Sequence, residues 1–266
     1  MKKHSLAIIG CGKLSHIVAD AWITGLLPDY HITGAYSRTH KTTRRFVDKL
    51  NDQVPQTKAI ACNSMEELLD LEADFIVEAA APVVVKEWAI PALQRGSSLV
   101  LLSIGALADE AFYDEVKKTA SENGRRIHLV SGSIGGFDVL RTISLMEKAK
   151  VSFHTEKGPD SLKDTAVYRE DLQAEKQVVF EGNAAEAIAL FPTKVNVAVA
   201  ASLATNGPEN IDVSITSTPG YTGDRHKISV KSEQIDALID IYSKTSEIAG
   251  WSVVHTLRNI TSPIVF

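Results

Sequence analysis

The sequence predicts an α/β fold: a Rossmann-type, doubly wound parallel sheet followed by a smaller α+β domain with a mainly antiparallel sheet. Three observations support this prediction. Residues 5 to about 130 alternate short apolar runs with longer amphipathic runs, which indicates buried strands and covering helices. A glycine loop follows the first apolar run. After about residue 150, apolar and polar residues alternate with period two, which is typical of a sheet with one solvated face.

The elements of the first half can be assigned in chain order. Strands are expected at 5–9, 31–36, 58–61, 74–78, 98–102 and 126–130. Between them lie amphipathic helices, one of which is expected to end near Leu50. Asn63-Ser64 with Glu67 resembles a capping box, and Asp109 is expected to cap a helix that ends at Gly124.

The second half carries a different pattern. Strands are expected at 151–155, 177–181, 212–216 and 227–230, and helices at 184–190, 195–205 and about 246–259. Residues 235–242 fit a strand or a helix equally well. We therefore expect a dinucleotide-binding domain at 1–132 and a substrate and dimerisation domain at 133–245. A helix at about 246–260 can pack back on the first domain.

Composition excludes several classes of protein. The 266 residues are 44% hydrophobic and 23% charged, as in ordinary soluble domains, and the net charge of −5 argues against a nucleic-acid partner. The apolar run at 6–9 is too short for a signal segment, and no stretch suits a membrane helix. With only two cysteines, Cys11 and Cys62, a cytoplasmic location is expected. No histidines have metal-ligand spacing, so no metal is expected.

The loop Gly10-Cys11-Gly12-Lys13-Leu14-Ser15 lies between a predicted strand and a predicted helix. In this context Gly10 permits a tight turn and Gly12 lets the backbone approach a pyrophosphate, while the helix N-terminus attracts the phosphates. Ser15 stands where glycine or alanine is usual and is small enough for close packing. The pattern predicts a dinucleotide site with contacts from Gly10, Gly12, Lys13 and Leu14. The alternative is that the glycines merely end a strand.

The residues after the second strand bear on which dinucleotide is bound. An NAD-specific site usually has a carboxylate there, but this chain has Ser37 and Arg38, followed by Lys41. Ser37 can bond a ribose 2′-phosphate and Arg38 can clamp it. We therefore expect NADP or NAD as the cofactor. NADP is expected to be accepted, and the sequence leaves open that it is preferred over NAD. The alternative is that Arg38 and Lys41 only begin a solvated helix.

Further segments carry a more specific signal, and together they resemble the L-aspartate dehydrogenase family over nearly the whole chain. These segments are Glu78-Ala79-Ala80-Ala81-Pro82, 103–109, Ser131-Gly132-Ser133-Ile134-Gly135-Gly136-Phe137-Asp138, 180–182, Phe191-Pro192 and Asn196-Val197-Ala198. The resemblance implies a Rossmann domain with an α+β domain, usually as a homodimer. It also implies reversible, NAD(P)-dependent oxidative deamination of L-aspartate to oxaloacetate and ammonia through iminoaspartate, a compound that feeds NAD biosynthesis in some organisms.

The resemblance implies a catalytic role for His226, which matches the histidine of a short Asn-x-His segment in the family. Asp224 replaces the asparagine, and Gly223 stands where some members have another histidine. The chemistry also calls for such a group, since a side chain that titrates near neutrality can move protons while water attacks an imine. From spacing alone, His226 would be read as a polar residue at a strand start.

The same residue-by-residue comparison implies nicotinamide-side contacts from Ser133 and Asn196, and we also expect Ala80 to contact the cofactor. Asn196 could alternatively, or additionally, cap its helix. Candidate ligands for the substrate carboxylates are Lys86, Arg141 and Lys194, among which the sequence does not choose.

Two alternative functions remain at this stage. One is a two-domain dehydrogenase acting on another small amino or hydroxy acid, which the Ser133 and Gly223 departures leave open. The other is a non-catalytic NADP-sensing protein, against which His226 argues.

Overall fold

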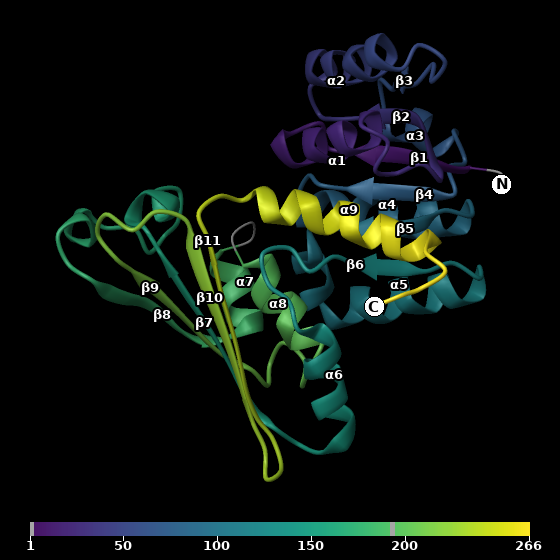
Figure 1. Cartoon of the computed structure of the whole chain (residues 1–266). Coiled ribbons are helices and arrows are strands. Elements are labelled where there is room, and N and C mark those ends of the chain that lie inside the picture. Colours follow the sequence, from purple (N-terminus) through teal and green to yellow (C-terminus); the bar gives the residue numbers. More distant parts are fainter. Residues whose placement is uncertain (1–2, 192–194) are drawn as a thin grey trace. The chain divides into compact units, whose positions relative to one another are not determined.

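The computed structural model describes residues 3–191 and 195–266 and divides the chain into two compact units (Figure 1). Unit 1 comprises Met1–Val130 with Ala249–Phe266, and unit 2 comprises Ser131–Ile248. The sequence had suggested a boundary after residue 132 and a C-terminal helix able to return to the first domain. Within the described ranges, no helix is long and apolar enough to cross a membrane.

Unit 1 is built on a parallel six-stranded sheet in the order β3-β2-β1-β4-β5-β6. Its strands are β1 (His4–Ile9), β2 (Tyr30–Tyr36), β3 (Ile60–Ala61), β4 (Phe75–Glu78), β5 (Ser98–Leu101) and β6 (Ile127–Leu129). Its helices are α1 (Lys13–Ile23), α2 (His40–Gln53), α3 (Met65–Leu69), α4 (Pro82–Gln94), η1 (Ile104–Ala108) and α5 (Glu110–Glu122), with most of α9 (Glu247–Thr261). This arrangement confirms the predicted doubly wound fold.

Local signals explain several of these boundaries. The Ser64 hydroxyl accepts from the Glu67 N–H at the start of α3, and the Asp109 carboxylate accepts from the Phe112 N–H at the start of α5. The third strand is shorter than the expected 58–61. Lys58 has a left-handed backbone with φ +53°, and this conformation interrupts an extended strand before Ile60.

The register of β1 gathers three chain segments at one edge of the sheet. Ile9 is aligned with Tyr36 of β2 and with Glu78 of β4. The strand order reverses at β1, since β2 lies on one side of it and β4 on the other. Carboxyl ends of strands at such a reversal are where open α/β sheets bind ligands.

The core of unit 1 includes the C-terminal helix. Leu6 and Ile8 of β1 form a buried cluster with Val253, Val254 and Leu257 of α9. The hydroxyl of buried Tyr30 also donates to the Leu257 carbonyl at 2.7 Å. The last helix is therefore an integral layer of this unit.

Unit 2 contains a five-stranded sheet in the order β11-β10-β7-β9-β8. The strands are β7 (Lys150–Lys157), β8 (Gln177–Asn183), β9 (Asp212–Ser217), β10 (Asp224–Lys231) and β11 (Asp236–Ser243). The helical elements are α6 (Phe137–Met146), η2 (Pro159–Leu162), η3 (Glu170–Gln173), α7 (Ala184–Leu190) and α8 (Asn196–Leu203). The sheet is mainly antiparallel, as expected.

Two features of this sheet were not resolved by the sequence. The β7–β9 pair is parallel, because the chain returns to the sheet through a long crossover that includes α7 and α8. Residues 236–243 form a strand, since β11 pairs with β10 along its full length. The periodicity of this segment allowed a strand or a helix, and the pairing with β10 shows that it is a strand.

Candidate functional site

The glycine loop after β1 is shaped by the neighbouring strands. Gly10 has φ +88°, and a Cβ on it would lie 2.6 Å from the Ala79 carbonyl oxygen. Its N–H donates to the Tyr36 carbonyl at 2.8 Å. Residue 10 must therefore be glycine, both for its backbone conformation and because the segment after β4 passes directly beside it.

Gly12, the second glycine of the loop, is not required by its backbone conformation. Gly12 precedes α1 with φ −86°, a conformation open to any residue, and a Cβ on it would meet no atom within 4 Å. The space over Gly12 can thus admit a group that approaches the backbone closely. A pyrophosphate in that space would face the positive end of the α1 dipole, so the loop fits a dinucleotide.

Ser15, the departure from the usual third glycine, has a structural explanation. Its side chain is fully buried and its hydroxyl donates to the Gly10 carbonyl. The serine therefore closes the loop with a hydrogen bond that alanine or glycine could not make. Cys11 within the loop is buried, and burial raises the pKa of its thiol to about 12, which suits a packing role rather than a reactive one.

Buried Glu78 at the end of β4 fixes the segment beside the glycine loop. Its carboxylate accepts from the Ala80 N–H at 2.7 Å and from the Ser103 N–H at 2.9 Å. Burial raises the pKa of Glu78, opposed by these hydrogen bonds. The carboxylate therefore ties the segment after β5 to the turn that carries Ala80.

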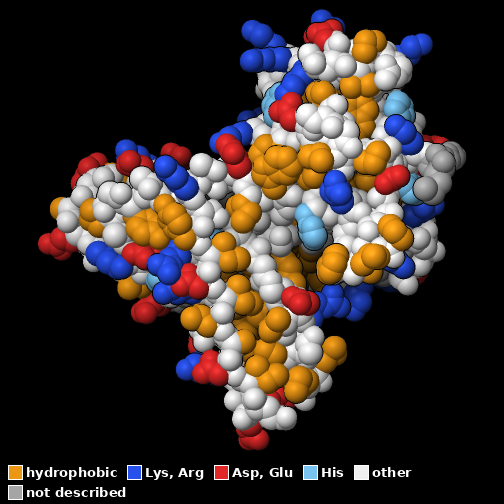
Figure 2. All heavy atoms as spheres, viewed as in Figure 1, with side chains coloured by type: hydrophobic (Ala, Val, Ile, Leu, Met, Phe, Trp, Pro, Cys, Tyr) orange, Lys and Arg blue, Asp and Glu red, His pale blue; other side chains and the backbone are white. Residues whose placement is uncertain are grey.

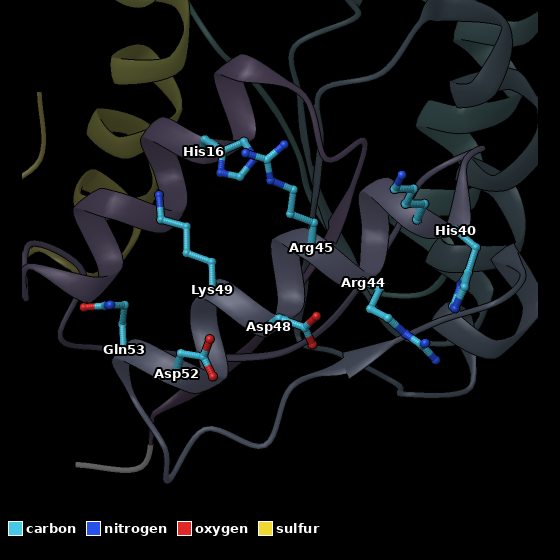
Figure 3. Close-up of a pocket in the computed structure, with 9 residues that line it drawn as sticks. His16, His40, Arg44, Arg45, Asp48, Lys49, Asp52 and Gln53 are labelled. Carbon is cyan, nitrogen blue, oxygen red and sulfur yellow. The ribbon is translucent and has the colours of Figure 1, made fainter.

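Ser37 and Arg38 follow β2 and precede α2, with Ser37 half-buried and Arg38 exposed. Next to them, a surface hollow extends along α1 and α2, as Figure 3 shows. Its lining is His16, His40, Lys41, Arg44, Arg45, Asp48, Lys49, Asp52 and Gln53. Lys41, in the first turn of α2, lines this hollow close to Arg38 in sequence, and the lining has four Lys and Arg residues against two Asp residues, so it is predominantly cationic.

In unit 2, His226 lies on the buried face of β10 and is only 4% exposed. Its Nδ1 is 3.0 Å from Oγ1 of Thr155 on the neighbouring strand β7, and its ring stacks on Phe153 at 5.7 Å between centroids. Burial lowers the pKa of His226 to about 4, with Lys157 acting in the same direction and Asp224 against it. The imidazole is therefore neutral at neutral pH.

Two residues further along these strands, on the same face, lies an ion pair between a buried lysine and a partly exposed aspartate. Lys157, 5% exposed, is aligned with Asp224, and their charged atoms are 3.4 Å apart. On the other side Lys157 is aligned with Ser217 of β9, which is fully buried. Sequence reasoning missed Lys157, although the signal was available. Its side chain falls on the buried positions of the period-two pattern of β7, where a lysine needs an explanation.

The backbone at Gly223 excludes any larger residue, including the histidine considered there in the sequence comparison. It has φ +78°, and a Cβ on it would collide with the Ser243 carbonyl oxygen of β11. A side chain at position 223 would therefore clash with this backbone, and His226 has glycine, not histidine, three residues before it.

Ser133 lies in a glycine-rich segment that packs against the start of α8. A Cβ on Gly132 would be 3.1 Å from Val197 Cγ1, so this segment and the residue after Asn196 are close neighbours. Asn196 is the first residue of α8, and Val195 occupies the N-cap position. The capping role considered for Asn196 is thus not the one observed.

The candidate carboxylate ligands from the sequence form no hydrogen bond or ion pair with His226 or Lys157 among the described residues. Lys86 pairs with Asp109 at 2.6 Å in unit 1, and Arg141 is exposed on α6. Lys194, like Pro192 of the Phe191-Pro192 segment, lies outside the described residues. In the part of the chain that the structure describes, no group of three His, Cys, Asp or Glu side chains could hold a metal ion.

Comparison with known proteins gives a consistent result. The family described as "Aspartate dehydrogenase, C-terminal" matches residues 138–260, and "Homoserine dehydrogenase, NAD binding domain" matches residues 31–130. The L-aspartate dehydrogenase of Methanococcus maripaludis strain C6 is 30% identical over 97% of both chains, and that of Methanocella arvoryzae is 31% identical over 97% of both chains. The crystal structure of aspartate dehydrogenase from Thermotoga maritima has a TM-score of 0.76 and 28% identity, covering 99% of each chain.

Proposed function

The chain belongs to the L-aspartate dehydrogenase family, and we infer that it catalyses reversible oxidative deamination of L-aspartate with a nicotinamide cofactor. The observation that carries this inference is the similarity over 97% of the chain, together with a loop at Gly10 and Gly12 that fits a dinucleotide. Unit 1 supplies the cofactor site and unit 2 supplies His226.

The reaction converts the amine of aspartate to an imine by loss of hydride, and water then attacks the imine. The bound cofactor supplies the hydride acceptor. We propose that His226 is the proton-transfer residue. If its Nδ1–H donates to Thr155 Oγ1, its Nε2 has a lone pair for a proton from the attacking water. Because burial keeps the ring neutral at neutral pH, this lone pair is available there.

We propose that the first unit accepts NADP as well as NAD and prefers NADP. Support comes from Ser37 and Arg38 after β2, where a carboxylate would select NAD, and from the cationic residues of the neighbouring hollow. Ala80, Ser133 and Asn196 are proposed as further cofactor contacts, from the family resemblance. The proposed assembly is a homodimer, which light scattering can test, and the proposed location is the cytoplasm.

The decisive experiment follows NADPH absorbance with oxaloacetate and ammonia, and then with a panel of other keto acids. Turnover with oxaloacetate is expected. Turnover only with a different acid would favour the second dehydrogenase reading, and cofactor binding without any turnover would favour a sensor. His226→Ala should lower kcat by orders of magnitude with little change in cofactor affinity; full activity in this variant would exclude His226 from proton transfer.

A further inference from the structure

We propose that Lys157, assisted by Ser217, binds one carboxylate of the dicarboxylate substrate. This proposal deepens the function proposed above and rests on it. It concerns a polar row that crosses three strands: Asp224 on β10, which is partly exposed, and the buried residues Lys157 on β7 and Ser217 on β9.

Lys157 places a cation in the interior of unit 2. Lys157 is 5% exposed, and lysines are almost never buried to this degree without a compensating partner. Its ion-pair partner among the described residues is Asp224, at 3.4 Å, a separation beyond the usual length of a charge-assisted hydrogen bond. An ammonium has three N–H donors, and one carboxylate at this distance leaves donor capacity for a second anion.

Ser217, on the strand next to Lys157, is also buried. Its hydroxyl is fully buried and makes no hydrogen bond within the described residues. A buried hydroxyl without a partner is costly, so such a group needs an explanation. Strand register places Ser217 beside Lys157 on the same face, where a bound carboxylate could accept from both side chains.

Lys157 and Ser217 lie close to His226 on the same face of the sheet. The row Asp224–Lys157–Ser217 lies directly beside the row that contains His226 and Thr155, because residues two apart on a strand share a face. A carboxylate held by Lys157 would therefore lie next to the imidazole. Aspartate carries carboxylates close to the carbon that loses hydride, so one anchored carboxylate would bring that carbon to the histidine.

The Asp224 side chain connects its ion pair with Lys157 to the solvent, because it is partly exposed. It is 40% exposed, against 7% for the Lys157 side chain. In the absence of substrate, Asp224 balances the buried ammonium. A substrate carboxylate entering from this side would meet the Lys157 ammonium, whose one ion-pair partner among the described residues is the partly exposed Asp224.

The test measures steady-state kinetics with oxaloacetate and the affinity of the NADP-bound enzyme for succinate by calorimetry. Lys157→Met should raise KM for oxaloacetate and Kd for succinate by about 10- to 100-fold, and Ser217→Ala by about 3- to 10-fold. The matched control is Lys150→Met, which removes an exposed lysine from the other end of β7 and should change neither value.

A purely structural ion pair makes a different prediction, which the double variant Lys157→Met with Asp224→Asn separates. If Lys157 only neutralises Asp224, removal of both charges restores succinate affinity and KM. If Lys157 binds substrate, the double variant keeps the weakened succinate affinity and the raised KM for oxaloacetate. Normal KM and succinate affinity in any folded Lys157 variant would overturn the proposal. Should every Lys157 variant fail to fold, unchanged succinate affinity in Ser217→Ala would overturn it.

The failure of this inference is distinguishable from failure of the proposed function. Suppose that the wild-type enzyme turns over oxaloacetate and that Lys157→Met turns it over at the same rate at low substrate concentration. This result refutes the carboxylate site and leaves the proposed reaction standing. A wild-type protein that binds succinate through Lys157 but turns over no oxaloacetate refutes the proposed reaction and leaves the site standing.

Discussion

The imidazole of His226 is held by a neighbour on the adjacent strand: its Nδ1 lies 3.0 Å from Oγ1 of Thr155 across the β10–β7 pair. This contact occupies one ring nitrogen and orients the other. A buried histidine that is both hydrogen-bonded and stacked on Phe153 has little freedom to rotate.

Replacing Thr155 by valine removes this hydrogen bond while keeping the side-chain volume. We expect kcat to fall about tenfold and KM to change little, because the hydroxyl positions His226 and is not expected to bind substrate. Thr155→Ser should restore most of the activity. Equal kcat in the valine variant and the wild type would show that Nδ1 needs no such partner.

The pH profile of kcat/KM should report the buried state of His226. The pKa of His226 is lowered to about 4. The activity that depends on the neutral ring should therefore persist well below pH 6.5 and be lost only as the pH approaches about 4. Asp224 acts to raise this pKa, so Asp224→Asn should move the acid limb to still lower pH. The control is Asp240→Asn, which removes the partner of Arg225 and should leave the acid limb unchanged. A shift of the limb toward neutral pH in Asp224→Asn would contradict this account.

The same pKa has a consequence for stability. The folded-state value lies below the ordinary 6.5 of histidine, so the unfolded chain binds more protons between these two values. The free energy of unfolding should therefore decrease as pH falls from 6.5 toward 4, and His226→Asn should show less of this decrease. Thermal melts across this range measure it; identical pH dependence in both proteins would count against a buried neutral ring.

The two glycines of the cofactor loop should respond differently to alanine. Gly10→Ala should destabilise unit 1, because the new Cβ meets the Ala79 carbonyl at 2.6 Å and φ is positive. Gly12→Ala should leave the melting temperature nearly unchanged but weaken NADP binding, since its Cβ enters open space that the pyrophosphate is expected to use. Calorimetric titration with NADP checks this, and unchanged affinity in a folded Gly12→Ala would remove the pyrophosphate from that space.

Arg38→Ala tests the cofactor preference. We expect KM for NADP to rise about 10- to 100-fold and KM for NAD to stay within about threefold, because only NADP carries the 2′-phosphate. Lys118→Ala, an exposed lysine on α5 that pairs with Glu122, serves as a control for charge alone. Equal effects on both cofactors would place Arg38 away from the ribose.

Several features could be predicted from the sequence because they depend on residues that are neighbours in the chain. Apolar runs in the first half and period-two alternation in the second identified most of the strands, and the capping residues Ser64 and Asp109 lie at helix starts as expected. The loop at Gly10 was recognisable because its function requires glycine at fixed spacing after a strand. The Ser15 departure could be noted, but its hydrogen bond to the Gly10 carbonyl could not be foreseen.

Only the tertiary structure decided the rest, because it depends on partners far apart in the chain. Residues 236–243 became a strand through pairing with β10, and Thr155 meets His226 although 71 positions separate them. Burial of Lys157 likewise follows from strands β9 and β10 on either side of it. The sequence by itself thus determined the fold class and the cofactor loop through local periodicity and backbone requirements. Long-range strand pairing decided which side chains surround His226, since no local pattern records the partner of a strand.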